Sequence, residues 1–422
     1  PPHQALWSPP MYYPSTNALA TSDCLFGLGL IYVPLRFLFD SYNSFMLTVI
    51  ALCTLNFASF YYLLKKYFKF NDLACAFGSF IFTFCLFRQE QLRHVQIFSL
   101  FLSVFAVIFF LKSKDKKWFS FIGTIFLALQ LYTSFYLGWL FFFALGLTLI
   151  IFLCFKDYRT QLFSFIKNYY KIILSNLVFY AILIAPLAYH YLQNEVLKFP
   201  FEVVKMFQTT FLNGILNNSF LDNLIFFKLE GFSENTYYGL GIFTTLFLIY
   251  GLIKLKTYRR YCIVITLCVL SIMNFIFIEK IIYDYVIGGG AIRALVRYFN
   301  ILIPIFAIIS AYTIQNLNKN VIKWLIIILI AVEQISVFPL FEWTKTGAEK
   351  IINSYNVPKT CNVIFIDYSK IPTSSNIELD KYEVDGMWVA LRNKIYTVHG
   401  YGASMQPRTQ TKLQPECILE LK

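Results

Sequence analysis

The sequence is dominated by apolar runs about as long as a helix needs to cross the hydrocarbon core of a bilayer, roughly 20 residues. Several runs are separated by only a few residues, which predicts antiparallel neighbouring helices. We therefore predict an all-α polytopic membrane helix bundle. The ten predicted spans are 42–64, 72–87, 95–111, 118–135, 137–155, 171–190, 239–255, 261–278, 293–314 and 322–340.

The composition excludes a soluble domain that would hide these runs in its core. Hydrophobic residues make up 58% of the 422 positions and charged residues only 14%, which is more apolar surface than a soluble domain can bury. The net charge of +13 would suggest nucleic acid in a soluble protein. Because the basic residues lie in short loops between apolar runs, we predict a lipid bilayer and no nucleic acid as the partner.

The distribution of Lys and Arg predicts how the bundle is oriented, since cytoplasmic loops carry an excess of both residues. Seventeen of them lie in five loops on one side of the ten spans, opposed only by Asp115 and Asp157. We predict that this side is cytoplasmic and that the membrane is the bacterial inner membrane. The five loops are 65–71, 112–117, 156–171, 254–260 and 315–323.

Three parts are expected along the chain. Residues 1–41 are predicted to form an extracytoplasmic first loop with an interfacial helix. Residues 42–340 are predicted to form the bundle, with a long external loop at 191–238. Residues 341–422 change in character and predict a small extracytoplasmic α/β domain that is cut short at its C-terminal end.

Local patterns refine the first and third parts. Asp23 follows Thr and Ser directly before an apolar run, which predicts a helix N-cap. In the tail, strands are expected at 361–367 and 395–399 and a helix at 383–393. The tail cysteines, Cys361 and Cys417, could form a disulfide if that part is exported, because exported compartments permit disulfides.

The beginning of the chain and its cysteines lead to two further expectations. The chain starts at Pro1 without Met and without the pattern of a signal peptide. We expect one more span upstream, which would carry the first loop across the membrane. The nine cysteines show no spacing that suits zinc, so no metal site is predicted, and a requirement for a divalent metal stays open.

Between two predicted spans, a short stretch concentrates the polar side chains Arg88, Arg93, His94 and Gln96. Ionisable groups at the end of a span usually face a cavity, a substrate or a headgroup. Arg88 and Arg93 could hold a phosphate or a sugar hydroxyl, with His94 as donor or proton carrier and Gln96 beside it. The alternative is that these residues end an external loop and contact lipid phosphates.

Two other stretches offer candidate site residues on the same predicted face. Asp23 could take a proton from an acceptor hydroxyl, or it could be an acid favoured by the dipole of the following helix. Arg293 and Arg297 follow three glycines and are four residues apart, which predicts one helix face. With the backbone amides of the turn they could cradle a phosphate or pyrophosphate at a helix N-terminus, or they could snorkel to lipid headgroups.

Taken in order, these residues resemble the polytopic glycosyltransferases of the GT-C superfamily, the bacterial relatives of the protein mannosyltransferases. The resemblance covers nearly the whole chain, but each motif is short. It consists of Trp7-x5-Tyr13-x3-Asn17-x-Leu19, Ser22-Asp23, Phe87-Arg88, His94-x-Gln96, Ser134-x-Tyr136, Gly239-x-Gly241, Arg293-x3-Arg297-Tyr298, Asp385-x2-Trp388 and the stretch 397–402 with His399.

The resemblance implies an inverting transfer of a sugar from a polyprenyl phosphate to a glycan, lipid or protein acceptor on the extracytoplasmic face. It implies an acid in the first external loop that acts on the acceptor, and arginines on the donor phosphate. In the family the key acid lies close after the first span, so we expect the principal acid upstream of Pro1. Asp23 matches a later acidic position, where relatives more often carry Glu.

Two rival functions stay open. A transporter or flippase for lipid-linked glycans would carry charges at mid-span and interrupted helices in two matching halves. A non-catalytic assembly protein of the cell envelope would bind a partner through its tail. The polar clusters lie at one face and the sequence shows no two-half symmetry, which favours the enzyme.

Overall fold

In the computed structural model the chain forms two compact units, which are described separately. The helical unit comprises Leu25–Ala185 and Lys198–Pro339, and the mixed unit comprises Pro1–Cys24, Pro186–Leu197 and Leu340–Lys422. The structure describes residues 6–193, 198–214, 219–225, 237–336, 345–367, 376–398, 400 and 418–420.

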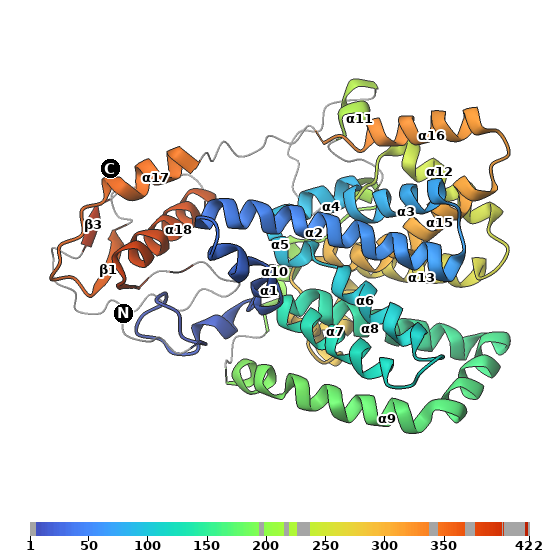
Figure 1. The fold of residues 1–422 in the computed structure, drawn as a ribbon, viewed down its shortest axis with the longest axis horizontal. Helices are drawn as coiled ribbons and strands as arrows, with labels where there is room; N and C mark the ends of the chain where they lie inside the picture. Colours follow the sequence, from blue (N-terminus) through green and yellow to red (C-terminus); the bar gives the residue numbers. More distant parts are fainter. Residues whose placement is uncertain are drawn as a thin grey trace. The chain divides into compact units, whose positions relative to one another are not determined.

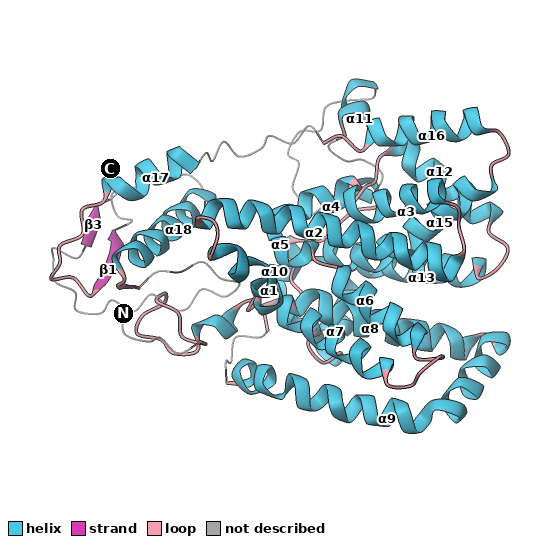
Figure 2. Cartoon of the chain, in the orientation of Figure 1, coloured by secondary structure: helices cyan, strands magenta, loops and turns pink. Residues whose placement is uncertain are grey.

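The described chain is mainly helical, as predicted (Figures 1 and 2). Its first half contains α1 (Phe26–Arg36), α2 (Ser41–Leu63), η2 (Leu64–Phe68), α3 (Asp72–Phe84), α4 (Leu86–Glu90), η3 (Gln91–His94), α5 (Val95–Phe98), α6 (Phe101–Lys112), α7 (Phe119–Thr133), α8 (Phe135–Cys154) and α9 (Lys156–Leu192). Its second half continues with α10 (Phe201–Met206), η5 (Leu212–Gly214), α11 (Phe220–Ile225), α12 (Ile242–Lys254), α13 (Arg259–Asn274), α14 (Ile276–Tyr285), η6 (Gly289–Ala291), η7 (Leu295–Ile301), α15 (Leu302–Asn316) and α16 (Asn320–Glu333).

Several of these helices are long and apolar enough to cross a membrane, which is consistent with a multi-pass membrane protein. Within the described ranges four meet this test: Ser41–Phe68, Phe135–Cys154, Lys156–Leu192 and Leu295–Asn316. The number rises to six if each of two bent helix pairs counts as one span. The structure therefore supports four to six spans, and the full number of ten stays a prediction.

The two bent pairs correct one expectation from the sequence. Residues 88–94 were expected to form an external loop between two spans. Instead α4, η3 and α5 make this stretch helical, and together with α6 it forms a pair bent by 70°. The second pair is α13 and α14, bent by 92° near Phe275. Apolar run length cannot reveal such breaks, because both sides of a break are equally hydrophobic.

The core of the helical unit lies where α3 packs along α15. Gly78 permits the close approach: a Cβ atom there would lie 2.9 Å from the Ala307 carbonyl and from Ala311 Cβ. The rings of Phe60 and Phe82 stack beside this contact with centroids 4.1 Å apart. The candidate spans differ in how far their apolar stretch of 18 residues is buried. In the span formed by η7 and α15, 78% of this stretch is buried, whereas in α9 only 6% is buried. α15 is therefore a central helix, whereas α9 has an exposed apolar surface.

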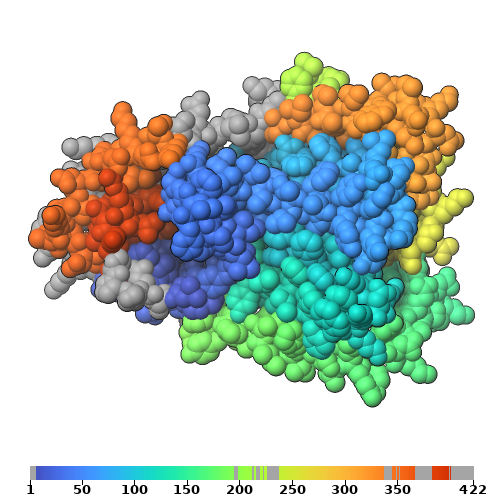
Figure 3. Space-filling model, in the orientation of Figure 1, coloured from blue at the N-terminus to red at the C-terminus, as the bar shows by residue number. Residues whose placement is uncertain are grey.

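Figure 3 shows the surface of the helical unit, with α2 in blue and α6 and α7 in teal side by side. Large apolar side chains remain exposed on these helices and on α9, for example Ile50, Ile125 and Leu177. A soluble protein rarely exposes so much apolar surface, whereas a lipid-facing bundle does so by necessity.

The mixed unit contains the described strands, drawn in magenta in Figure 2. β1 (Val363–Asp367) lies between β2 (Tyr396–Thr397) and β3 (Ile418–Glu420), and both pairs are parallel. The helices α17 (Lys345–Ser354) and α18 (Asn376–Asn393) belong to the same unit. The strand expected at 361–367 and the helix expected at 383–393 are thus present as β1 and the second half of α18.

The N-terminal segment joins this sheet. The amide of Thr397 donates to the Pro10 carbonyl at 2.8 Å, and the amide of Tyr13 donates to the Thr397 carbonyl at 3.0 Å. The ring of Tyr13 also packs on that of Tyr396, with centroids 4.9 Å apart. Residues far apart in the sequence therefore build one unit.

Cys361 is disulfide-bonded, and its predicted partner Cys417 lies outside the described residues. His399 also lies outside the described residues. Of the second strand expected at 395–399, β2 covers Tyr396 and Thr397.

Candidate functional site

The candidate site begins at the N-terminus of α8. Ser134 has an extended backbone, which separates α7 from α8, and its Oγ accepts a hydrogen bond from the amide of Leu137 at 3.4 Å. This cap places Tyr136 in the first turn of α8, where its side chain is buried. The first turn is also the positive end of the dipole of a 20-residue helix.

Arg297 lies directly over Tyr136. The guanidinium carbon is 4.2 Å from the centre of the Tyr136 ring, and the residue is only 5% exposed. Within the described chain, its guanidinium makes no hydrogen bond and no ion pair. A buried charge without acceptors costs several kcal/mol, so this position favours an anionic ligand.

Arg293 reaches the same tyrosine from the turn before η7. Its backbone amide donates to the Tyr136 hydroxyl at 3.5 Å, and its half-buried guanidinium lies 5.2 Å from the ring centre of Phe199. This guanidinium also forms no ion pair with a carboxylate of the described residues. The guanidinium of Arg297 and the backbone amide of Arg293 thus both contact Tyr136. We call Tyr136, Arg293 and Arg297 the arginine–tyrosine site.

The sequence placed both arginines on one helix face with a cradle of glycine amides, and the shared helix face is wrong. Arg293 lies in an extended stretch and Arg297 in the 3-10 helix η7, because Ile292 and Ala294 have extended backbone angles. The amides of Gly289 and Ala291 already donate to backbone carbonyls. These two amides are therefore not available to a phosphate, and a cradle formed by the other amides of the turn stays a prediction.

A buried carboxylate lies near this segment but does not neutralise it. Glu279 of α14 is fully buried and accepts a hydrogen bond from the Tyr298 hydroxyl at 3.4 Å. Its other oxygen, Oε2, has no hydrogen-bond partner among the described residues. It forms no ion pair with Arg293 or Arg297. The positive charge of the arginine–tyrosine site therefore remains uncompensated among the described residues.

Arg88, which the sequence proposed as a substrate contact, has different surroundings. Its side chain is fully buried, and Nη1 donates to the Ile97 carbonyl at 3.0 Å and to Asn300 Oδ1 at 3.2 Å. Nη2 donates to the Phe98 carbonyl, and the Phe98 ring lies 4.5 Å from the guanidinium carbon. These carbonyls end α5 just before the bend into α6. In this structure Arg88 braces the helix break.

Asn300 connects the brace to the candidate site. Its Oδ1 accepts the hydrogen bond from Arg88, and its Nδ2 donates to the Arg297 carbonyl at 3.0 Å. Asn300 is 3% exposed and also lines the cavity described below. Arg88 thus acts on the segment that carries Arg297 through one amide side chain.

The remaining predicted residues of this stretch do not join Arg88. Arg93 is exposed, whereas His94 and Gln96 are half-buried at the junction of η3 and α5. The sequence offered Arg88, His94 and Gln96 as parts of one site. The side chains of His94 and Gln96 are not among the hydrogen-bond partners of Arg88, which are Ile97, Phe98 and Asn300. The roles of Arg93, His94 and Gln96 stay predictions.

Asp23 belongs to the mixed unit, so its place relative to the arginines is not described. It is half-buried and is separated from the first residue of α1 by Cys24 and Leu25. The predicted N-cap is wrong, because α1 begins at Phe26 and its N-cap residue is Leu25, in a left-handed conformation with φ of 59°. The part that Asp23 plays with an acceptor stays a prediction.

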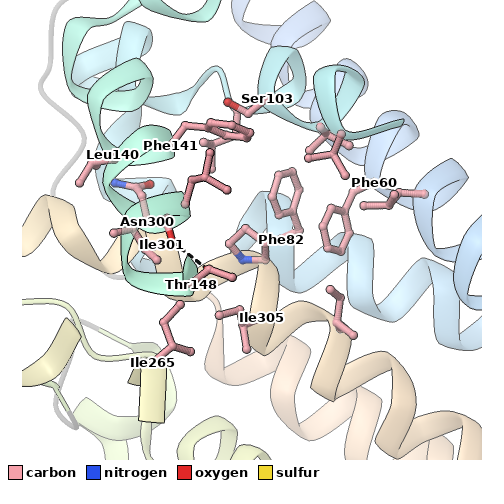
Figure 4. A pocket seen from close by; sticks show the side chains of 18 of the residues that line it. Phe60, Phe82, Ser103, Leu140, Phe141, Thr148, Ile265, Asn300, Ile301 and Ile305 are labelled. Atoms are coloured by element: carbon pink, nitrogen blue, oxygen red, sulfur yellow. Dashed lines mark hydrogen bonds between the residues drawn. The ribbon is translucent and has the colours of Figure 1, made fainter. Parts of the chain in front are cut away.

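The helical unit contains a cavity of about 400 Å³. Tyr136, Arg293 and Arg297 do not line it, but Asn300, which donates to the Arg297 carbonyl, does. Its walls are almost entirely apolar and come from α2, α3, α6, α8, α13 and α15 (Figure 4). On α8 the lining includes Leu137 and Leu140, which follow Tyr136 in the same helix. Figure 4 shows Asn300 beside Leu140 at one side of this cavity. We call this cavity the apolar groove.

Polar groups in the wall of the apolar groove are mostly satisfied. Ser103 Oγ donates to Gln130 at 2.9 Å, and the Thr148 hydroxyl lies 2.9 Å from that of Tyr261. Such a wall suits a hydrocarbon chain, because no buried polar group would lose a partner when the chain enters.

The sequence analysis gave no role in binding to two residues of this arrangement. Tyr136 is part of the motif Ser134-x-Tyr136, and a Tyr at the end of a span is by default an aromatic of the membrane interface. Asn300 was overlooked, although a polar side chain inside an apolar run is itself a signal of function. Burial and contacts distinguish both residues from their neighbours.

No group of three or more His, Cys, Asp or Glu side chains within the described ranges could hold a metal ion. No protein-family model, curated protein or solved structure matches the chain.

Proposed function

We propose that this protein is a polytopic membrane glycosyltransferase that transfers a sugar from a polyprenyl phosphate to a glycan, lipid or protein acceptor. The donor would bind with its phosphate at Arg293 and Arg297 and with its chain in the apolar groove. The finer features that this proposal includes are ten spans, a bacterial inner membrane, an extracytoplasmic site and an extracytoplasmic α/β unit at the C-terminal end.

One observation carries the proposal: a buried arginine without a counter-ion among the described residues is connected through Asn300 to the wall of an apolar groove. Arg297 is 5% exposed and makes no ion pair within the described chain. Asn300, three residues later, lines the groove. A ligand that satisfies both features combines an anionic head with a long hydrocarbon chain, as a lipid phosphate does.

The chemistry asked of these residues is binding and charge stabilisation. When the sugar leaves the donor, negative charge grows on the phosphate that is released. Guanidiniums held in a dry site stabilise such developing charge far better than they would in water. Asp23 would accept the proton of the acceptor hydroxyl.

Replacement of Arg297 tests the proposal. Arg297→Ala should abolish sugar transfer from a polyprenyl phosphate donor in proteoliposomes while the amount of folded protein stays unchanged. Arg260→Ala is the matched control, because Arg260 is an exposed arginine in the first turn of α13, in the same helical unit. Full transfer activity in the Arg297→Ala variant would refute the assignment.

A second candidate, a transporter or flippase for lipid-linked glycans, is favoured by the broken helices. The bends of 70° between α5 and α6 and of 92° between α13 and α14 are typical of discontinuous transporter helices. Vesicles that contain the purified protein and a fluorescent polyprenyl phosphate sugar would separate the two functions. Movement of the lipid between leaflets without any transfer to an acceptor would support the transporter.

A further inference from the structure

The arginine–tyrosine site contains one side chain to which the proposed function has given no role. We propose that Tyr136 is a binding residue for the donor phosphate, with its ring holding Arg297 in place and its hydroxyl donating a hydrogen bond to the phosphate. This inference rests on the proposed function and adds a third binding group to the same site.

The ring of Tyr136 sets the position of the guanidinium. Arg297 lies over the ring face at 4.2 Å and has no hydrogen bond within the described chain that could hold it otherwise. A guanidinium on an aromatic face keeps its N–H groups available, because these donors lie in its own plane. The ring therefore fixes Arg297 without using the donors that an anion needs.

The hydroxyl of Tyr136 has a hydrogen to offer. It accepts the amide hydrogen of Arg293 at 3.5 Å, and it donates to no acceptor among the described residues. A phenol can accept and donate at the same time. Tyr136 is only 7% exposed and has the Arg297 guanidinium over its ring. An anionic oxygen held by that guanidinium would be a suitable acceptor for the hydroxyl.

The place of Tyr136 in α8 links the head of the ligand to its chain. Tyr136 lies in the first turn of α8, and Leu137 and Leu140 of the same helix line the apolar groove. The helix dipole adds positive potential at that end. A phosphate at Tyr136 would thus be joined to a chain that runs along the wall formed by this helix.

The test compares four variants of the full chain in detergent or nanodiscs: Tyr136→Phe, Tyr136→Leu, Arg297→Ala and Tyr67→Phe. The last is the matched control, because the Tyr67 hydroxyl also donates a hydrogen bond, to the Ile108 carbonyl at 3.2 Å, in the same unit. The probes are polyprenyl phosphate, the uncharged polyprenol and inorganic phosphate, with binding measured as a dissociation constant.

We expect Tyr136→Phe to weaken polyprenyl phosphate binding by about 10-fold, the effect of one hydrogen bond to a charged group. Tyr136→Leu should weaken it by about 100-fold, since the support of Arg297 is also lost. Neither change should alter polyprenol binding, which a merely structural defect would weaken equally. Tyr67→Phe should bind all probes as the wild type does.

The outcomes separate this inference from the proposed function. If Arg297→Ala loses polyprenyl phosphate binding while Tyr136→Phe binds normally, the phosphate site stands and the role of the Tyr136 hydroxyl is refuted. If both variants bind normally, the proposed phosphate site itself fails. Binding of inorganic phosphate as tight as that of the lipid would identify a free anion as the ligand and overturn the lipid assignment.

Discussion

Arg88 and Arg297 are both buried in the helical unit, yet they stand in opposite situations. Arg88 donates to the carbonyls of Ile97 and Phe98 and to Asn300, whereas the described residues offer the Arg297 guanidinium the face of Tyr136 and no hydrogen-bond acceptor. The difference teaches that burial alone does not identify a binding residue. A buried arginine with acceptors stabilises the fold, and one without acceptors is available to a ligand.

The largest effect should follow from removal of the brace. Arg88→Met keeps much of the side-chain volume but leaves the Ile97 and Phe98 carbonyls and Asn300 Oδ1 without their donor. We expect the free energy of unfolding to fall by about 3 kcal/mol or more, because each buried unsatisfied group costs about 1–3 kcal/mol. Thermal unfolding of the purified protein in detergent measures this loss. A variant that unfolds like the wild type but no longer binds donor would instead make Arg88 a ligand contact.

The next effect should be one on binding rather than on the fold. Arg297→Met removes an uncompensated charge, so the unliganded protein should unfold at the wild-type temperature or above it. Its affinity for polyprenyl phosphate should fall by about 100-fold, or about 2.7 kcal/mol. Parallel measurements of unfolding and lipid binding check both parts. A clear loss of thermal stability would show that Arg297 has a structural role like that of Arg88.

Asn300→Leu should show an intermediate effect on both quantities. The change removes one of the two acceptors of Arg88 Nη1 and the donor to the Arg297 carbonyl. We expect a loss of about 1–2 kcal/mol in the free energy of unfolding and donor binding that is several-fold weaker. A double-mutant cycle with Arg88→Met measures how far the two residues act as a unit. Strict additivity would argue against the link through Asn300.

The smallest effect is expected for a paired cation at the surface of the helical unit. Lys280 forms an ion pair with Asp284 at 2.9 Å, one helical turn along α14. Exposed pairs of this kind contribute about 0.3–0.5 kcal/mol, so Lys280→Met should lower the stability by no more than this. Donor binding should be unchanged. Weaker lipid binding in this variant would extend the cationic surface beyond the arginine–tyrosine site.

Much of the helix content could be predicted, because apolar run length is a property of local sequence. α2, α8 and η7 with α15 coincide with predicted spans, and β1 with a predicted strand. The stretch 88–94 could not be predicted as helical, since its polarity is that of a loop. Its helical form depends on Arg88, which satisfies the carbonyls at the end of α5.

The candidate site was predictable only in part. Arg293 and Arg297 were proposed as phosphate contacts from their type and position, and that role stays a prediction. Their geometry could not be predicted, because it depends on the extended backbone around Ile292 and Ala294. The sequence could not show that Leu25, rather than Asp23, is the N-cap residue of α1. Leu25 adopts a left-handed conformation, which a leucine side chain does not favour.

By itself the sequence determined that this chain is a helical protein with apolar segments suited to a bilayer, because hydrophobicity acts through composition and run length. It also determined which cations are available. Only the tertiary structure decided which of them are already paired, because the acceptors of Arg88 lie up to 212 positions away in the chain. The same holds for Tyr136, whose role depends on two arginines that another segment brings to the first turn of α8.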